Sequence, residues 1–416
     1  MQIPKGDFDC LTCKGRLHCG LSYCPIIIKT KAYSKITDTL QEKNVKDFSG
    51  TAPSVFVGRV GYPQVNVGIL STQQEKSEEY DAPKMWAKKN LDIPTIIHFR
   101  SSLINSKFSA NVRLRNTFLE KSQEIGLASK PTSVEMELQD KPYFHIQYTP
   151  SSPPMGPNAL LKKVRLTENP KIPTKIEKVY SDTDWKAKDA LTYLHKNEFD
   201  ENYLSRILSI GTVGIKKQRR LVPTRWSITA VDDTIGKDTI EEIKKNVHAD
   251  FQIFFGGYLG NYFLILFFSD AWSYELFEMY APNVAWNVTD TLRYTTDHES
   301  YSGRKEYAEQ CAGGYYAARL AISEKLIQMN RQASVLCLRF ITDDYAVPLG
   351  VWVVREAVRK ALSAKPLEMD CKENMITYAK EFSKKKFGID LSEILKKSVL
   401  ATEMRTQIKL TNFFTR

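Results

Sequence analysis

Residues 51–70 read TAPSVFVGRVGYPQVNVGIL, a pattern that predicts β-structure around a tight turn. Two short apolar segments flank the sequence GRVGYP, whose glycines and proline are typical of turns. After this turn, Val65, Val67 and Ile69 alternate with other residues, which places their side chains on one face of a strand. The first part of the chain is therefore predicted to contain a sheet.

Other short runs on the C-terminal side extend this β-structure. TIIHFR (95–100) is typical of a short buried strand. SVEMELQ (133–139) alternates cleanly, and YFHIQYT (143–149) follows it after the turn residues DKP, so the two runs predict a hairpin. The next residues, TPSSPPMGPN (149–158), contain prolines that interrupt both helices and sheet ladders, and we place a domain boundary at about 150–175.

The second half of the sequence alternates helical and strand-like runs. DWKAKDALTYLHK (184–196) has a helical pattern, and strands are predicted for RWSITAV (225–231), NYFLILFF (261–268) and SVLCLRFI (334–341). Helices are expected at 238–248, 315–329, 354–363 and 372–386. This alternation indicates a mixed α/β fold, with a mixed sheet and surrounding helices. The predicted parts are a metal-binding knuckle (1–30), an N-terminal α/β region (31–150), a proline-rich crossing (151–178), a C-terminal α/β domain (179–400) and a flexible tail (401–416).

The composition limits the class of protein. A chain of 416 residues suits two or three domains, and a hydrophobic content of 42% is ample for globular folding. Lys and Arg outnumber Asp and Glu by 59 to 48, a net charge of +11 that favours a polyanionic partner such as nucleic acid. No apolar run approaches the roughly 20 residues that span a bilayer, and the first residues lack the plan of a signal peptide. We therefore expect an intracellular protein without a membrane partner.

Four of the seven cysteines lie close together near the start of the chain. Cys10, Cys13, Cys19 and Cys24 are spaced Cys-x2-Cys-x5-Cys-x4-Cys, within CLTCKGRLHCGLSYC. Four thiolates suit a closed tetrahedral zinc site, in which the metal would fold a segment too small to have its own core. His18 could replace one thiolate. An iron–sulfur cluster is the alternative, because a proline follows Cys24 as it often follows cluster cysteines.

The last residues, TQIKLTNFFTR, carry a second motif. Gln407, Leu410 and Phe413 are three residues apart, so one turn of 3₁₀ helix would put them on one face with Phe414 beside them. This is the spacing of the peptide that binds ring-shaped sliding clamps of the PCNA type. The alternative is a terminal helix that folds back on the body of the protein.

Basic residues gather in GIKKQRRLVPTR (214–225), after the glycines at 211 and 214. Such residues beside a glycine-rich turn suit phosphate oxygens, although a solvated surface loop has the same composition. Trp226 could stack on a base, and Asp232 and Asp233 at the end of the expected strand could hold a catalytic Mg²⁺ or Mn²⁺. The full set of candidate phosphate or base contacts is Arg59, Tyr62, Arg100, Ser102, Lys216, Lys217, Arg219, Arg220, Arg225 and Trp226.

Several stretches carry a family resemblance: PSVFVGRVGYPQVNVG, SIGTVGIKKQRRLVPTRWSITAVDDTIG, AGGYYAARLA, RQASVL and VPLGVWVVRE. They resemble blocks of the archaeal Nre family of DNA repair proteins, and the resemblance covers nearly the whole chain. It implies a role in DNA damage tolerance or repair with recruitment by a sliding clamp, in the cytoplasm at the nucleoid. It does not imply a particular reaction. Two classes remain open, an enzyme such as a nuclease and a non-catalytic DNA-binding adaptor that links the clamp to other repair factors.

Overall fold

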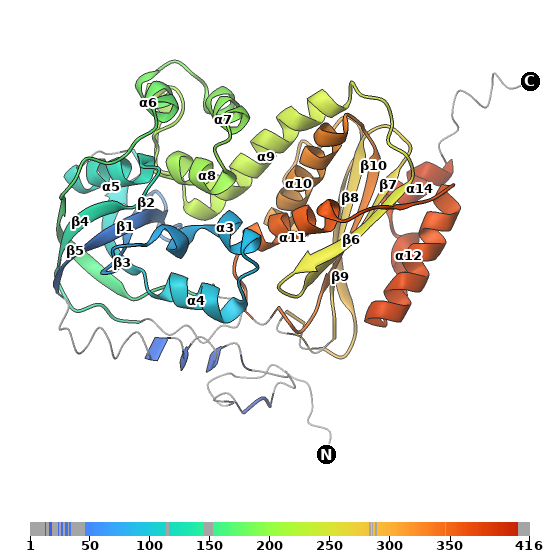
Figure 1. Cartoon of the computed structure of the whole chain (residues 1–416), viewed down its shortest axis with the longest axis horizontal. Coiled ribbons are helices and arrows are strands. Elements are labelled where there is room, and N and C mark those ends of the chain that lie inside the picture. Colours follow the sequence, from blue (N-terminus) through green and yellow to red (C-terminus); the bar gives the residue numbers. More distant parts are fainter. Residues whose placement is uncertain are drawn as a thin grey trace, which may run out of the picture. The chain divides into compact units, whose positions relative to one another are not determined.

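The chain folds into two compact units. The computed structural model describes residues 46–406 apart from 114–115, 145–152, 283, 285, 288 and 346, and from the first 45 residues it describes 13, 16–18, 24, 26–27, 30–31 and 33–34. The first unit comprises Met1–Ile235 and Ala346–Gly350, and the second comprises Gly236–Tyr345 and Val351–Arg416. Each unit has a mixed sheet and several helices, so the predicted mixed α/β fold is confirmed (Figure 1).

The sheet of the first unit closes into a barrel in the order β1-β2-β3-β5-β4. The predicted turn joins β1 and β2, which pair in antiparallel register with Val57 opposite Val67. Only the β3–β5 pair of this barrel is parallel. Closure leaves no exposed sheet edge. The strands are β1 (Asp47–Val57), β2 (Gln64–Thr72), β3 (Ile104–Asn111), β4 (Thr132–Leu138) and β5 (Asn158–Leu166).

The strand predicted at 133–139 is confirmed as β4, which pairs with β1 and β5. Most of its predicted hairpin partner, 143–149, lies outside the described residues. Tyr143 forms an antiparallel bridge with Asn158 at the start of β5. The proline-rich range 151–178 thus supplies β5 to the barrel, and the two compact units divide between Ile235 and Gly236.

The strand predicted at 95–100 is wrong, because these residues belong to helix α4 (Ile93–Ser101). The carboxylate of Asp92 caps the helix by accepting a hydrogen bond from the Thr95 backbone N–H at 2.9 Å. Pro94 lies in the first turn, where its missing N–H has no helical partner to lose. The cap and the proline begin a helix, and the apolar run then continues it.

Other helices surround the barrel. Arg206 of α8 holds the barrel by donating to the backbone carbonyls of Pro53 (2.8 Å), Gly126 (3.0 Å) and Ala128 (2.7 Å). The helical elements of this part are η1 (Glu78–Asp81), α3 (Pro83–Lys88), α5 (Thr117–Leu127), α6 (Thr174–Ser181), α7 (Ala187–Lys196), α8 (Glu201–Ser209) and η2 (Lys216–Gln218).

Helix α9 (Thr224–Ile243) replaces the strand predicted at 225–231, and it confirms the helix predicted at 238–248 over residues 238–243. Its buried residues recur at helical spacing, including Ser227, Val231, Ile235 and Ile243. Pro223 begins the helix, and its carbonyl accepts from the Trp226 backbone N–H at 2.8 Å. The β-branched residues Ile228, Thr229 and Val231 are typical of a strand, but the prediction at 225–231 is wrong.

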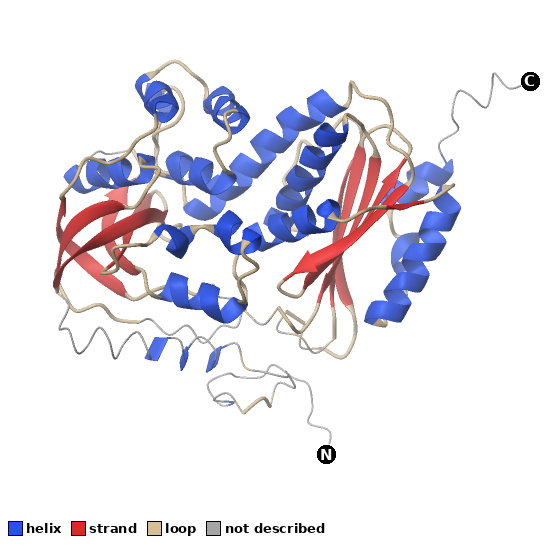
Figure 2. Ribbon diagram, viewed as in Figure 1, coloured by secondary structure: helices blue, strands red, loops and turns tan. Residues whose placement is uncertain are grey.

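The second unit is built on a six-stranded sheet in the order β11-β6-β7-β10-β8-β9, in which only β8 and β10 are parallel neighbours. The strands predicted at 261–268 and 334–341 are confirmed as β7 and β10. They are almost wholly buried because helices cover both faces of the sheet (Figure 2). The strands are β6 (Gln252–Tyr258), β7 (Asn261–Phe268), β8 (Ser273–Tyr280), β9 (Arg293–Glu299), β10 (Ser334–Ile341) and β11 (Leu367–Glu368).

Helices α10 (Ala312–Met329) and α11 (Trp352–Ser363) lie on one face of this sheet. Helices α12 (Lys372–Phe387), α13 (Ser392–Lys396) and α14 (Val399–Thr406) lie on the other face, over a cluster of apolar side chains from β7, β8 and β10. The helices predicted at 315–329, 354–363 and 372–386 are confirmed as α10, α11 and α12. Among the described residues, no helix has the length and apolar character needed to cross a membrane.

Candidate nucleic-acid interface

Three segments that are distant in the sequence meet on the surface of the first unit. The Val112 backbone N–H donates to the Pro63 carbonyl at 3.0 Å, and the Leu221 N–H donates to the Val112 carbonyl at 2.9 Å. The Val57 N–H donates to the side-chain oxygen of Thr224 at 2.9 Å. These bonds join the β1–β2 turn, the end of β3 and the start of α9. We call residues 58–63, 111–113 and 215–226 together the basic surface.

Two glycines shape the turns of this surface. Gly61 has φ of +84°, and a Cβ added there would lie 2.7 Å from the Gln64 carbonyl oxygen. Gly211 has φ of +70°, and a Cβ added there would lie 2.7 Å from the Arg220 carbonyl oxygen. The two glycines therefore allow the chain to pack closely on either side of the exposed arginines.

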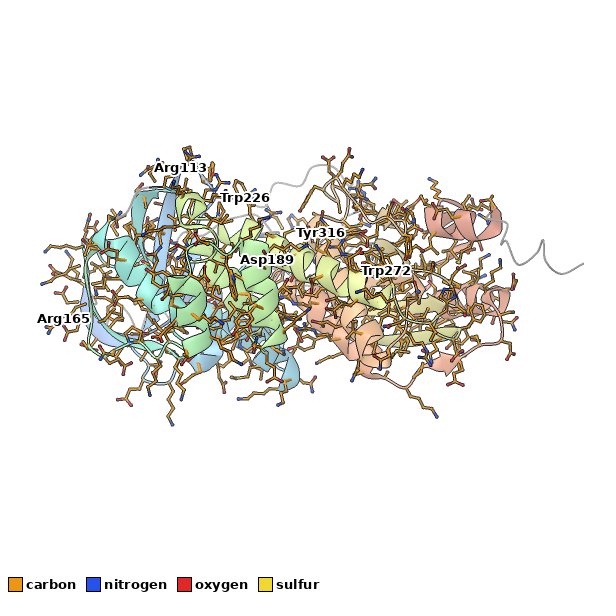
Figure 3. All side chains as sticks on the ribbon, turned by 90° about the horizontal axis from the view of Figure 1, so that it is seen from above. Arg113, Arg165, Asp189, Trp226, Trp272 and Tyr316 are labelled. Atoms are coloured by element: carbon orange, nitrogen blue, oxygen red, sulfur yellow. The ribbon has the colours of Figure 1, made fainter. Side chains whose placement is uncertain are left out.

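Two aromatic side chains lie beside each other on the basic surface. The ring centroids of Tyr62 and Trp226 are 5.3 Å apart, and the ring planes are inclined at 52°. Both side chains remain accessible, with 43% of Tyr62 and 46% of Trp226 exposed. Figure 3 shows Trp226 and Arg113 near the same outer edge of the first unit. The rings therefore offer flat, accessible faces among cationic neighbours.

The charge of the basic surface has one sign. Its exposed cations are Arg59, Arg113, Lys216, Lys217, Arg220 and Arg225, whereas none of its three segments contains Asp or Glu. Arginine and lysine side chains clustered on one surface produce a positive potential that attracts phosphate groups. Arg113 was missed by the sequence analysis, because the contacts of Val112 with Pro63 and Leu221 that bring it to this surface join distant segments.

Arg219 has a different role from its neighbours. Its guanidinium donates to the backbone carbonyls of Gly214 (2.7 Å), Tyr180 (2.7 Å) and Asp182 (2.6 Å). The last two carbonyls lie at the C-terminal end of α6, where backbone acceptors lack helical partners. Arg219 therefore fastens the loop to α6, and the exposed cations around it remain the candidates for phosphate contact.

Arg100 and Ser102 lie at the end of α4, and they also contact the protein itself. The Arg100 guanidinium forms an ion pair with Asp81 at 3.3 Å and lies 5.3 Å from the ring centroid of Trp86. The Ser102 hydroxyl donates to the His98 carbonyl at 2.8 Å. Both side chains thus have local structural roles, and we leave them out of the basic surface.

Asp232 and Asp233 do not follow a strand, as the sequence analysis expected, but lie within α9. Asp232 is fully buried and Asp233 is half-buried. Consecutive residues of an α-helix project about 100° apart, so the two carboxylates point in different directions. Their positions give no support to the paired metal-binding role.

The predicted metal site and clamp-binding peptide fall largely outside the described residues. Cys13 is buried and Cys24 is half-buried, but Cys10 and Cys19 are not described. All four residues of the clamp motif, Gln407, Leu410, Phe413 and Phe414, are likewise not described. Within the described part of the chain, no three His, Cys, Asp or Glu side chains are grouped so as to hold a metal ion.

A network of buried charges in the second unit was not anticipated from the sequence. Arg319 of α10 and Glu299 of β9 form an ion pair at 2.8 Å, with both side chains 1% exposed, and the Trp272 indole N–H donates to Glu299 at 3.2 Å. Arg339 of β10 pairs with Glu278 of β8. These charged groups bind one another, which indicates a structural role.

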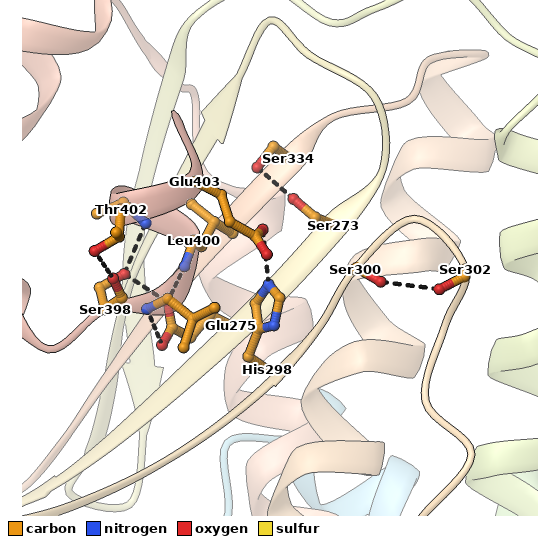
Figure 4. Close-up of polar contacts among 12 residues, drawn as sticks. Ser273, Glu275, His298, Ser300, Ser302, Ser334, Ser398, Leu400, Thr402 and Glu403 are labelled. Carbon is orange, nitrogen blue, oxygen red and sulfur yellow. Dashed lines mark hydrogen bonds and ion pairs between the residues drawn. The ribbon is translucent and has the colours of Figure 1, made fainter. Parts of the chain in front are cut away.

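The carboxylate of Glu275 begins helix α14 on the opposite face of the same sheet (Figure 4). It accepts hydrogen bonds from the Ser398 hydroxyl (2.5 Å) and from the backbone N–H groups of Val399 (3.1 Å) and Leu400 (3.0 Å). The sequence SYELFEMY (273–280) contained a sign of these buried carboxylates, because two glutamates interrupt an otherwise apolar strand. Because they are three residues apart, Glu275 and Glu278 face opposite sides of the sheet.

A barrel unit and a second α/β unit, with a basic surface on the first, define a two-unit basic α/β protein. The family model described as "Archaeal Nre, N-terminal" matches residues 18–287, and the model described as "Archaeal Nre, C-terminal" matches residues 299–413. The chain therefore belongs to the archaeal Nre family, as the resemblance in its sequence implied.

Three curated relatives extend over most of the chain. DNA repair protein NreB of Archaeoglobus fulgidus is 36% identical over 400 residues, covering 95% of this chain and 98% of its own length. DNA repair protein NreA of Haloferax volcanii is 34% identical, with coverage of 87% and 88%. DNA repair protein NreA of Archaeoglobus fulgidus is 37% identical, with coverage of 89% and 92%. No solved structure matches the chain significantly.

Proposed function

We propose that this protein acts in DNA repair, that its basic surface binds DNA and that its C-terminal peptide recruits it to a PCNA-type sliding clamp. The names of the three relatives support the repair role. The observation that carries the DNA contact is the meeting of three segments without acidic residues around Tyr62 and Trp226. We place this activity in the cytoplasm, at the nucleoid.

The DNA contact is tested by removing charge from the basic surface. In the variant R220A/R225A, the slope of log affinity against log salt should fall by about 1.4 to 1.8, because each lost phosphate contact removes about 0.7 to 0.9. The matched control is K384A/K385A, which removes two exposed cations of α12 and should leave the slope unchanged. Fluorescence anisotropy of a labelled DNA with single- and double-stranded parts measures the affinity of both variants at each salt concentration. An unchanged slope in R220A/R225A would remove the basic surface from the interface.

Clamp recruitment is tested at the two terminal aromatic residues. Replacing Phe413 and Phe414 with alanine should cost on the order of 3–5 kcal/mol of binding free energy, enough to abolish a micromolar interaction. Replacing Lys409 with alanine is the control and should preserve binding to the clamp. Thermal unfolding of the double variant should match that of the wild type. A large loss of thermal stability would instead mean that the phenylalanines pack on the protein's own body.

One structural zinc ion would be held by Cys10, Cys13, Cys19 and Cys24. Elemental analysis of the purified protein detects this zinc, whereas iron with sulfide would indicate a cluster instead.

Incubating the protein with labelled single-stranded, duplex and damaged DNA, with and without Mg²⁺ or Mn²⁺, separates an enzyme from an adaptor. Metal-dependent products would establish an enzyme, and binding without products would support the adaptor.

A further inference from the structure

We propose that the basic surface binds single-stranded DNA, and that Trp226 and Tyr62 stack on an unpaired base. This inference rests on the proposed DNA contact and specifies the form of DNA that is bound. It follows from three features of the surface, namely accessible aromatic faces, backbone hydrogen bonds that anchor both rings, and several exposed cations on the same segments.

The accessible rings would stack on unpaired bases but not on paired ones. In a duplex the faces of the bases are already stacked on one another, so an aromatic side chain at the surface reaches them only in unpaired strands. Tyr62 and Trp226 are both nearly half exposed, and Val60 in the same turn is 81% exposed. Their 52° inclination excludes a base sandwiched between parallel rings. A base therefore stacks on the outer face of one ring and contacts the edge of the other.

Both rings are carried on backbone that the fold holds in place. Trp226 lies in the first turn of α9, where its N–H donates to the Pro223 carbonyl. Tyr62 lies in a turn closed by the Gln64 N–H and the Gly61 carbonyl at 2.9 Å and tied to β3 through Val112. Rings on anchored backbone lose little conformational entropy when a ligand covers them, which favours binding.

The surrounding charge selects a nucleic acid over a protein. Arg59, Arg113, Arg220 and Arg225 are exposed on the same three segments that carry the rings, and these segments contain no Asp or Glu. Arginines beside aromatic rings suit a chain that alternates phosphates with flat bases. An apolar protein partner would place these cations against uncharged groups at a cost in desolvation.

The test measures the affinity of wild type and variants for labelled oligo-dT, for a blunt duplex and for an oligo-dT whose bases are replaced by abasic sites. W226A should weaken oligo-dT binding about 5- to 150-fold, the loss of one base–aromatic stack, and should change duplex affinity less than about twofold. Its salt slope should equal that of the wild type, since no charge is removed. Y62A should have a smaller effect of the same kind, and W226F should retain most of the affinity.

Two controls make the outcome specific. W286A removes another exposed tryptophan, 37% exposed and stacked on Tyr345 in the second unit, and should leave oligo-dT binding unchanged. On the abasic strand, W226A and wild type should bind equally, because no base remains to stack.

Three results would overturn the proposal. Unchanged oligo-dT affinity in both W226A and Y62A would exclude stacking, and equal losses on oligo-dT and duplex would exclude selectivity for unpaired bases. A protein that binds neither DNA would exclude both proposals. If R220A/R225A flattens the salt slope while W226A binds oligo-dT normally, the proposed DNA contact stands and only the stacking is refuted. An unchanged slope in R220A/R225A refutes the proposed DNA contact itself.

Discussion

Replacing Glu275 with glutamine should release helix α14 from the sheet. Glu275 is completely buried, and its carboxylate accepts from the Ser398 hydroxyl and from two backbone N–H groups at the start of α14. Glutamine keeps one acceptor oxygen of nearly the same shape. It places an NH₂ group where the second oxygen was, facing donors that then have no acceptor.

The expected loss follows from these bonds. A hydrogen bond to a charged group contributes about 1.5–3 kcal/mol, and a helix start also loses the favourable interaction of the negative charge with its dipole. E275Q should therefore lower the free energy of opening of α14 by about 3 kcal/mol, which corresponds to roughly 100-fold faster exchange of its protected amides.

Hydrogen exchange measured by mass spectrometry is the suitable assay, because it reports on one helix of a chain with two compact units. Peptides that contain Val399–Thr406 should exchange faster in E275Q, whereas those from β6 should keep their protection. E393Q is the control, since Glu393 and its partner Lys396 are exposed on α13, where such a pair contributes about 0–1 kcal/mol. Exchange of α14 within about twofold of the wild type in E275Q would refute the assigned role of this carboxylate.

Three further outcomes are expected. R319M should destabilise the second unit by about 3–5 kcal/mol in denaturant titrations, because Glu299 would stay buried without its cation, and R319M/E299Q should recover part of the loss. Burial raises the pKa of Tyr203 from 10.0 to about 12, so its contribution to stability is complete below pH 10 and is lost as the pH rises toward 12; Y203F should lack this component in unfolding measured across that range. C13S should lower the zinc content measured by elemental analysis below that of the wild type, while C337S, at a buried position of β10, should leave it unchanged.

The elements that sequence patterns predicted correctly have one buried face or two. Val65 and Val67 alternate because β2 buries one side in the barrel, and the continuous apolar run of β10 reflects burial on both sides. The two wrong strands, 95–100 and 225–231, are short apolar runs, in which periodicity does not separate strand from helix. In each case a proline at the helix start, Pro94 or Pro223, carried the information that the apolar pattern lacked.

The candidate surface was only partly predictable for a different reason. Tyr62, Arg220 and Trp226 were predicted from the sequence, but the segments that carry them are joined by hydrogen bonds between residues far apart in the chain, such as Val57 and Thr224. The neighbours Arg219 and Arg220 show most clearly why the sequence alone does not identify the exposed cations of the basic surface. One binds the end of α6 and the other faces solvent, although nothing in their local sequence separates them.

The hydrogen bonds between Glu275 and the start of α14 limit the distance at which Leu410 can lie from the second unit. The helix ends at Thr406, so Gln407 follows with no intervening residue and Leu410 is four residues on. Even a fully extended chain spans about 14 Å over four residues. As long as Glu275 holds α14, a clamp that takes up Leu410 must come within that distance of the helix end. In the proposed recruitment, the second unit would therefore lie close to the ring, because Leu410 is only four residues beyond the end of α14.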